Sequence, residues 1–163
     1  MKRSKRIKIA LIVLGVVFLI INILWGINYL SYSKYTVNSP EGMSLFTLQV
    51  AYRTESDGIS YTVKRPDYLT KHGNLASVSA DGNISILAWP SYCCAAMESY
   101  GLMLYDEAAQ EGYMFYVDED LNFSARNFGR LEPDIADAAM QLLEVMKEEV
   151  YAQFMCMRNE FGF

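Results

Sequence analysis

The feature that most constrains this chain is an uncharged apolar run near its N-terminus, residues 9–27. In an α-helix, with a rise of about 1.5 Å per residue, such a run extends over roughly 28 Å, which is close to the hydrocarbon thickness of a bilayer. Residues 1–8 hold five basic residues and no acidic ones. The positive-inside rule therefore predicts a cytoplasmic basic tail over 1–8 and an extracytoplasmic location for residues 31–163.

Both ends of this run carry side chains that favour the boundary between lipid and water. Long basic side chains reach toward the headgroups, and the amphipathic rings of Trp and Tyr are enriched at the same depth. The expected interface anchors are Lys5, Arg6, Lys8, Trp25 and Tyr29. We expect a transmembrane helix over 9–30 that acts as a signal anchor, followed by a juxtamembrane linker over 31–43.

A cleaved signal peptide is the competing interpretation of the same leader. It requires an apolar core of roughly 7–15 residues and a cleavage site with small residues. Ser31-Tyr32-Ser33 supplies such a site, but the apolar run is longer than a signal peptide needs. The length favours an uncleaved anchor, and cleavage after Ser33 stays an open alternative.

The remainder of the chain has the composition of a folded acidic domain. Residues 31–163 contain nine basic and 19 acidic residues, a balance of −10. This charge disfavours a nucleic-acid binder, which needs basic groups to neutralise phosphates. The hydrophobic content of 52% and the aromatic content of 13% are too high for a disordered chain. We expect one domain over residues 44–163.

Three pairs of segments in this domain alternate apolar and polar residues with a period of two. That period is typical of half-buried strands. The predicted pairs are residues 44–54 with 59–65, 75–80 with 84–89, and 100–105 with 113–117. Asp81-Gly82-Asn83, between the second pair, is the strongest hairpin signal in the chain. Sequential hairpins predict an antiparallel meander of about five to seven strands.

The last segment changes to a helical period. Pro133 suits the first turn of a helix. The apolar residues that follow recur at spacings of three and four, and form one stripe: Ile135, Ala138, Ala139, Leu142, Met146, Val150, Phe154 and Met157. We predict a helix from residue 133 to about residue 158. The fold class is therefore α+β: a single N-terminal transmembrane helix, then an antiparallel β-meander packed against one long C-terminal α-helix.

Motifs that carry chemistry are missing from the sequence. His72 is the only histidine, and no nucleophile signature or glycine-rich phosphate loop is present. The run from Asp118 to Asn122 begins like a calcium loop, but Phe123 stands at the required glycine and Gly129 at the required glutamate. We predict no catalytic residue, no metal site and no cofactor, and we favour a non-enzymatic role.

Three cysteines allow one disulfide and leave one free thiol. Outside the cytoplasm, Cys93 or Cys94 could pair with Cys156 if the helix end lies beside that loop. The alternative is that all three are small buried hydrophobic residues. The odd count matches no disulfide framework.

Aromatic residues close to predicted loops form the candidate interaction surface. It comprises Tyr68, Trp89, Tyr92 and Tyr100. Tyr is common in binding surfaces because it gives contact area at a small entropic cost. Lys64, Arg65, Lys71 and His72 form a basic cluster that could touch anionic headgroups, although a solvated loop of mixed charge is the preferred interpretation.

These observations favour a small single-pass membrane protein whose outer domain has a binding or accessory function. Its layout is common among bacterial envelope proteins, which indicates little about activity. Expected partners are the lipid bilayer together with another membrane or envelope protein or a second copy, and nucleic acid is excluded. Two alternatives stay open. One is a membrane-anchored hydrolase that uses a pair of carboxylates. The other is a structural, self-assembling envelope protein, which should expose a broad apolar patch.

Overall fold

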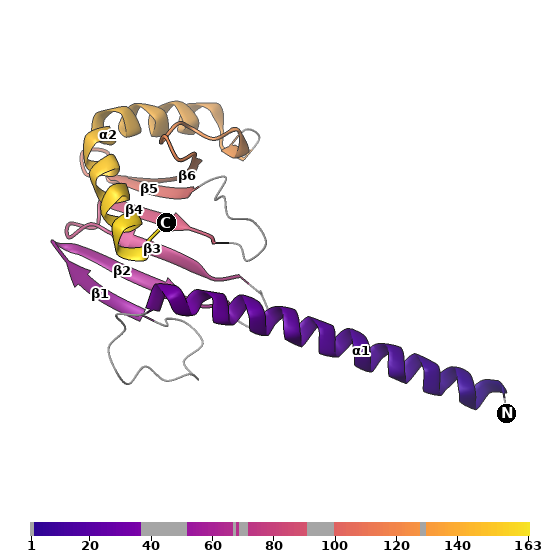
Figure 1. Cartoon of the computed structure of the whole chain (residues 1–163). Coiled ribbons are helices and arrows are strands. Elements are labelled where there is room, and N and C mark those ends of the chain that lie inside the picture. The colour runs from indigo at the N-terminus through magenta and orange to yellow at the C-terminus, as the bar shows by residue number, and fades with distance from the viewer. Residues whose placement is uncertain (1, 37–51, 67, 69–71, 91–99, 128–129) are drawn as a thin grey trace.

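The computed structural model describes residues 2–36, 52–66, 68, 72–90, 100–127 and 130–163. A long N-terminal helix leads into a six-stranded antiparallel sheet, and a second long helix closes the chain (Figure 1). The elements in order are α1 (Lys2–Ser31), the 3-10 helix η1 (Tyr32–Thr36), β1 (Tyr52–Ser56), β2 (Ile59–Lys64), β3 (Asn74–Val78), β4 (Ile84–Ala88), β5 (Tyr100–Asp106), β6 (Glu111–Val117), η2 (Ala125–Asn127) and α2 (Pro133–Phe161). The predicted α+β fold is confirmed.

The sheet is a simple meander in which each strand pairs with the next one along the chain. β1 and β2 are joined by Asp57 and Gly58, both with positive φ, as a two-residue hairpin turn of the primed kind requires. The strands predicted from the sequence, 44–54 and 59–65, leave four residues between them. The observed turn has only two residues, because β1 continues to Ser56. Most of the predicted strand over 44–54 lies outside the described residues.

The period of two gives the sheet a closed face and an open face. On the closed face, one row crosses five strands through Tyr61, Ser77, Ile86, Leu102 and Phe115. All of these side chains are buried. On the opposite face the parallel row is Thr62, Ala76, Leu87, Gly101 and Tyr116. The alternation predicted from the sequence therefore places the core on one side of the sheet.

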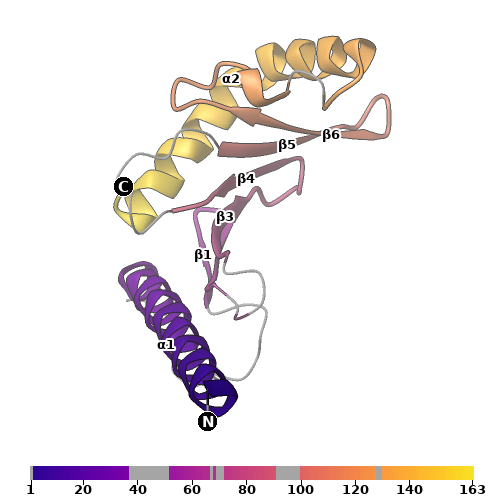
Figure 2. The same cartoon turned by 90° about the vertical axis from the view of Figure 1, so that its right-hand side faces the viewer.

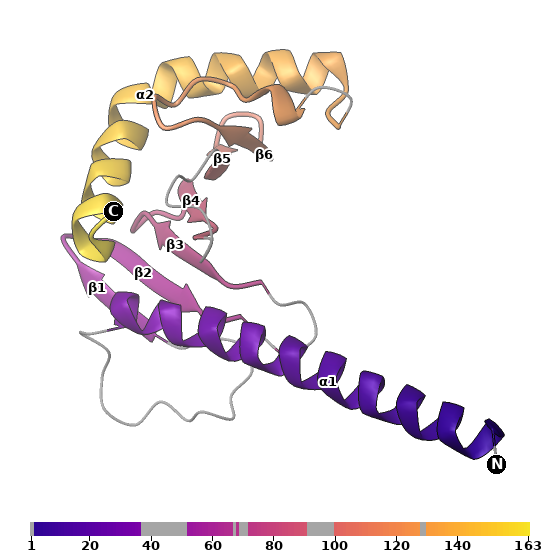
Figure 3. The ribbon, with the colours of Figure 1, turned by 45° about the vertical axis from the view of Figure 1, so that its right-hand side comes forward.

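α2 covers the closed face, and it bends on the way (Figure 3). It begins at Pro133 as predicted and ends at Phe161, about three residues beyond the predicted end near residue 158. Gly162 caps it, since its left-handed backbone lets its N–H donate to the Arg158 carbonyl at 2.8 Å. Its buried residues are Ala139, Leu143, Val150, Gln153, Phe154, Met157 and Phe161. Ile135, the first residue of the predicted stripe, is 42% exposed, so burial begins one turn later at Ala139.

A buried polar contact fixes α2 over the middle of the sheet. The Gln153 amide donates to the Ser77 hydroxyl at 3.1 Å and to the Ile84 carbonyl at 3.3 Å. The Ser77 hydroxyl in turn lies 3.5 Å from the Met157 sulfur. A buried polar group without a partner is costly. The position of α2 that pairs Gln153 with Ser77 and Ile84 is therefore favoured over one in which α2 is shifted along its axis.

α1 extends away from the sheet, and its apolar side chains are exposed along most of its length (Figure 1). The stretch Ile7–Tyr35 is long and apolar enough to cross a membrane. A signal sequence can also meet these criteria of length and apolar composition, so this property alone does not separate the two interpretations of the leader. The second view shows the C-terminal end of α1 close to the sheet (Figure 2).

Candidate functional site

The C-terminal end of α1 makes direct contacts with the loop that follows β2. The indole N–H of Trp25 donates to the Pro66 carbonyl at 3.1 Å, and its ring lies edge-on to Tyr68 with the centroids 5.3 Å apart. One turn later, the Arg65 guanidinium donates to the Tyr29 hydroxyl at 3.1 Å and lies 5.0 Å from its ring centroid. We call these five residues the junction. Two of the predicted interface anchors, Trp25 and Tyr29, therefore also hold the domain against the helix.

Beyond the junction, η1 inserts an aromatic side chain into the domain. Tyr32 is only 2% exposed, and its hydroxyl donates to the Pro90 carbonyl at 3.1 Å. Its ring lies against Gly73, where a Cβ atom would be 2.8 Å from the ring and 2.5 Å from the Lys64 carbonyl oxygen. Gly73 is thus required by close approach rather than by a turn. The segment predicted as a linker, 31–43, contributes core residues at its start.

A second tyrosine of η1 contacts the end of α2. The Tyr35 ring meets Phe161 edge-on with centroids 6.2 Å apart, and Phe161 meets Tyr61 of β2 at 5.9 Å. Burial, with smaller contributions from Cys156, Glu160 and Asp57, raises the pKa of Tyr61 to about 12. The phenol therefore stays neutral at physiological pH. η1 and the last turn of α2 share one aromatic cluster on the closed face.

The structure describes three of the four aromatic residues of the predicted interaction surface, and it places these three in different surroundings. Tyr68 belongs to the junction, and Trp89 lies on the open face with its ring 5.8 Å from Tyr116. Tyr100 is 4% exposed and packs edge-on against Phe154, so it belongs to the core. Its position at the start of β5, facing α2, is the reason for this burial. Tyr92 lies outside the described residues.

On the open face of the sheet, Trp89 is joined by side chains that sequence reasoning did not single out. Trp89 lies across Gly101, where a Cβ atom would be 2.5 Å from Cη2 of the indole. The Arg130 guanidinium lies 5.6 Å from the centroid of the Tyr116 ring. Two methionines on the neighbouring row, Met103 and Met114, are 42% and 55% exposed and face each other across β5 and β6. A glycine inside an otherwise bulky strand was the available signal for the Trp89 contact.

Cys156 is half-buried on α2 and packs against the core. It is a free thiol with respect to the described residues. Cys93 and Cys94, its predicted disulfide partners, lie outside that part of the chain. The pairing stays a prediction.

Two aspartates with shifted pKa values serve as turn acceptors. The Ser79 hydroxyl and the Asn83 N–H donate to Asp81 at 2.5 and 3.0 Å, which lowers the pKa of that carboxyl. For Asp118, burial acts to raise the pKa, but hydrogen bonds from Asn122 and Asp120 outweigh it and lower the pKa.

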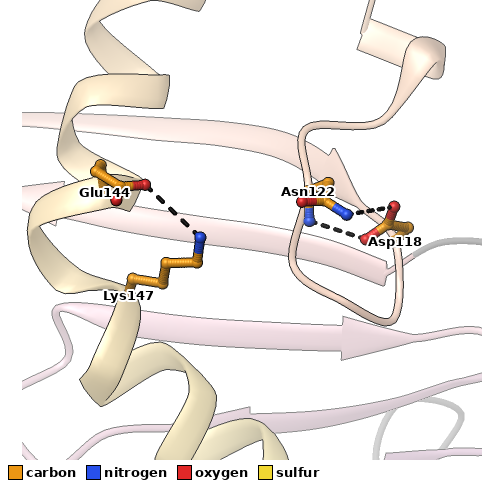
Figure 4. Close-up of polar contacts among 4 residues, drawn as sticks. All are labelled: Asp118, Asn122, Glu144 and Lys147. Atoms are coloured by element: carbon orange, nitrogen blue, oxygen red, sulfur yellow. Dashed lines mark hydrogen bonds and ion pairs between the residues drawn. The ribbon is translucent and has the colours of Figure 1, made fainter.

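Figure 4 shows Asp118 held by the side chain and backbone of Asn122. The Asp120 N–H also donates to this carboxyl at 3.0 Å, as in an Asx turn. The same view shows Glu144 and Lys147 as an exposed ion pair on α2, with 3.7 Å between Nζ and the carboxylate oxygen. Among the described residues, no group of three His, Cys, Asp or Glu side chains is placed to bind a metal. Both shifted carboxyls favour the ionised form, so they give the hydrolase alternative no general acid.

Comparisons with protein-family models, with curated proteins and with solved structures give no match for this chain.

Proposed function

We propose that this chain is an uncleaved single-pass membrane protein whose outer domain is held close to the bilayer and binds a partner through its open sheet face. The observation that carries the proposal is the continuity of α1, η1 and the sheet. Tyr32, which follows α1 directly, is a core residue of the domain. A signal peptide is discarded after cleavage, so its residues are not expected to fill the core of the mature protein.

Cleavage after Ser33 would remove specific interactions from the folded domain. It would delete Tyr32, with its hydrogen bond to Pro90, as well as both helix residues of the junction. Deleting a buried aromatic side chain costs about 3–5 kcal/mol, a large part of the 5–15 kcal/mol that keeps a typical domain folded. The energetics therefore support retention of the leader.

The proposed orientation follows from the basic tail and the acidic domain. An acidic outer domain carried by a single membrane helix suits an accessory or sensing role. The exposed methionines of the open face support such a contact, because flexible thioether side chains adapt to a partner surface.

Intact mass and reporter fusions test the anchor. We expect the membrane fraction to contain the full 163-residue chain of 18.5 kDa. A C-terminal alkaline phosphatase fusion should be active and a C-terminal green fluorescent protein fusion dark, since each reporter works on one side of the membrane only. Replacing Lys5, Arg6 and Lys8 by Gln should lower phosphatase activity by weakening the positive-inside bias. A chain found without its first 33 residues would contradict the proposal.

Site-specific photocrosslinking tests the open face. A photoreactive residue at Met114, in native membranes, should capture one defined partner, and Met103→Glu should abolish the capture by placing a charge beside it. Val145 is 83% exposed on α2 and provides the matched position for a control probe. If both positions capture the same proteins, or if Met103→Glu changes nothing, the open face is not the binding surface. Capture of a second copy would favour the self-assembling alternative.

A further inference from the structure

Four basic residues lie in the segments next to the point where α1 meets the domain. We define the cationic collar as Lys34, Lys64, Arg65 and His72. Arg65 contacts Tyr29, and Lys34 lies 4.6 Å from the ring centroid of its neighbour Tyr35. Lys34 and His72 are exposed and Lys64 is half-buried. Residues scattered along the sequence are thereby gathered beside one helix end.

The collar has the opposite charge to the rest of the domain. The described residues of segments 31–36 and 62–74 contain three basic residues and no acidic residue, a balance of +3 with His neutral. The other residues of 31–163 contain six basic and 19 acidic residues, a balance of −13. A solvated loop of mixed charge does not explain why the cations are concentrated at this end.

The contacts of α1 set the depth of the collar relative to a bilayer. The apolar run ends at residue 27, so Trp25 and Tyr29 lie at the level where such rings meet the headgroups. Both residues touch the 65–68 loop directly. Tyr32 and Tyr35 follow within about 10 Å along the helical path, which keeps the collar within one Debye length of the lipid surface.

We infer that the cationic collar binds the headgroups of anionic phospholipids in the leaflet from which α1 emerges. The inference rests on the proposed membrane anchor, and it adds a lipid class that the proposed function does not specify. Each basic residue near an anionic surface contributes a favourable interaction, and the acidic remainder of the domain is repelled. Binding of this kind would hold the domain upright, with its hairpin turns directed away from the membrane.

Fluorescence quenching of Trp25 measures lipid enrichment at this place. We would use the full chain with Trp89→Phe, so that Trp25 is the single tryptophan, in phosphatidylcholine vesicles containing phosphatidylglycerol. Brominated phosphatidylglycerol and brominated phosphatidylcholine are then compared as quenchers. We expect phosphatidylglycerol to be favoured about fivefold near Trp25 at low salt, and the preference to fall in 1 M salt.

Matched variants assign the preference to the collar. Lys34→Gln with Lys64→Gln should bring the ratio close to one, whereas Lys34→Arg with Lys64→Arg should preserve it. Lys5→Gln with Lys8→Gln removes the same charge at the opposite end of α1, about 30 Å away, and should leave the ratio unchanged. If Trp89→Phe does not fold, the difference between the natural chain and Trp25→Phe gives the same signal.

The outcomes separate this inference from the proposed anchor. Strong but equal quenching by the two lipids would overturn the lipid preference and leave the anchor in place. A preference that disappears in the tail variant and persists in the Lys34 and Lys64 variant would also overturn it. Absence of quenching by either lipid would contradict the membrane location of the junction itself.

Discussion

Replacing Tyr32 by alanine tests whether the residue that follows α1 belongs to the core of the domain, on which the anchor proposal depends. The side chain is 2% exposed, lies against Gly73 and Tyr35, and donates a hydrogen bond to Pro90. Truncating a buried aromatic ring costs about 3–5 kcal/mol, and a hydrogen bond of this kind contributes about 1 kcal/mol. We expect Tyr32→Ala to lose about 4 kcal/mol, and Tyr32→Phe, which keeps the ring, to lose about 1 kcal/mol.

Thermal unfolding of the full chain in detergent micelles measures this loss. Near-ultraviolet circular dichroism follows the packing of the aromatic residues, whereas α1 stays helical in the micelle. Each kcal/mol shifts the midpoint by roughly 3–4 °C in a domain of this size, so Tyr32→Ala should unfold about 12–16 °C below the natural chain. Tyr151, which is 53% exposed on α2, is the matched control, and Tyr151→Ala should shift the midpoint by about 2 °C or less.

The reasoning fails if Tyr32→Ala behaves like Tyr151→Ala. In that case residues after α1 would not belong to the core, and the main argument against cleavage after Ser33 would be lost. An equal loss in Tyr32→Phe and Tyr32→Ala would show instead that the hydrogen bond to Pro90, and not the ring, carries the stabilisation.

Three further predictions concern a close backbone contact, a buried hydrogen bond and a turn carboxylate. Gly73→Ala should lower the free energy of unfolding, measured with denaturant, by about 1–3 kcal/mol, because the new Cβ would lie 2.5 Å from the Lys64 carbonyl oxygen. Gly112→Ala should be neutral, because its Cβ would make only an ordinary contact at 3.8 Å. Equal effects of the two substitutions would contradict the close approach at Gly73. Gln153→Ala should lower the free energy of unfolding by about 1–2 kcal/mol, because the hydrogen bond to the Ser77 hydroxyl is lost. Gln141 is exposed on the same helix, so Gln141→Ala should change the free energy of unfolding by no more than about 0.5 kcal/mol. A neutral Gln153→Ala would refute the buried contact. Because the pKa of Asp81 is lowered from its ordinary value of 3.8, its ionised carboxylate contributes stability that is complete above pH 3.8 and is lost as the pH falls below that value. Asp81→Asn should therefore flatten the acid side of a curve of unfolding free energy against pH. An unchanged slope would contradict a stabilising role of this carboxylate.

The junction holds the end of α1 against the domain. Trp25 and Tyr29 contact the loop after β2, and Tyr35 meets Phe161 at the end of α2. Through Tyr32, Tyr35 and Phe161, ring contacts link η1 to the last turn of α2.

Local periodicity in the sequence was enough to place most of the elements. The period of two located β2 to β6 within a few residues, since alternate side chains must face opposite sides of a sheet. Pro133 marked the start of α2. Backbone N–H groups in the first turn of a helix have no partner within the helix, so a proline there loses no hydrogen bond. The uncharged run identified α1 by its length alone.

The site could not be predicted to the same degree, because its contacts join residues far apart in the chain. Tyr32 and Pro90 are 58 positions apart, and Trp25 and Pro66 are 41. Period and composition mark Tyr100 and Trp89 equally as aromatic residues near loops, yet one is in the core and the other on the open face. Only the packing of α2 over one face of the sheet distinguishes them.

The sequence by itself determined a helix long and apolar enough to span a membrane, an antiparallel meander and a terminal helix, because these depend on spacings within about twenty residues. The tertiary structure decided which residues after α1 belong to the domain, which sheet face stays open, and where the cations gather. Each of these depends on the shape that remains after distant elements have packed, such as the space above Gly73 that Tyr32 fills.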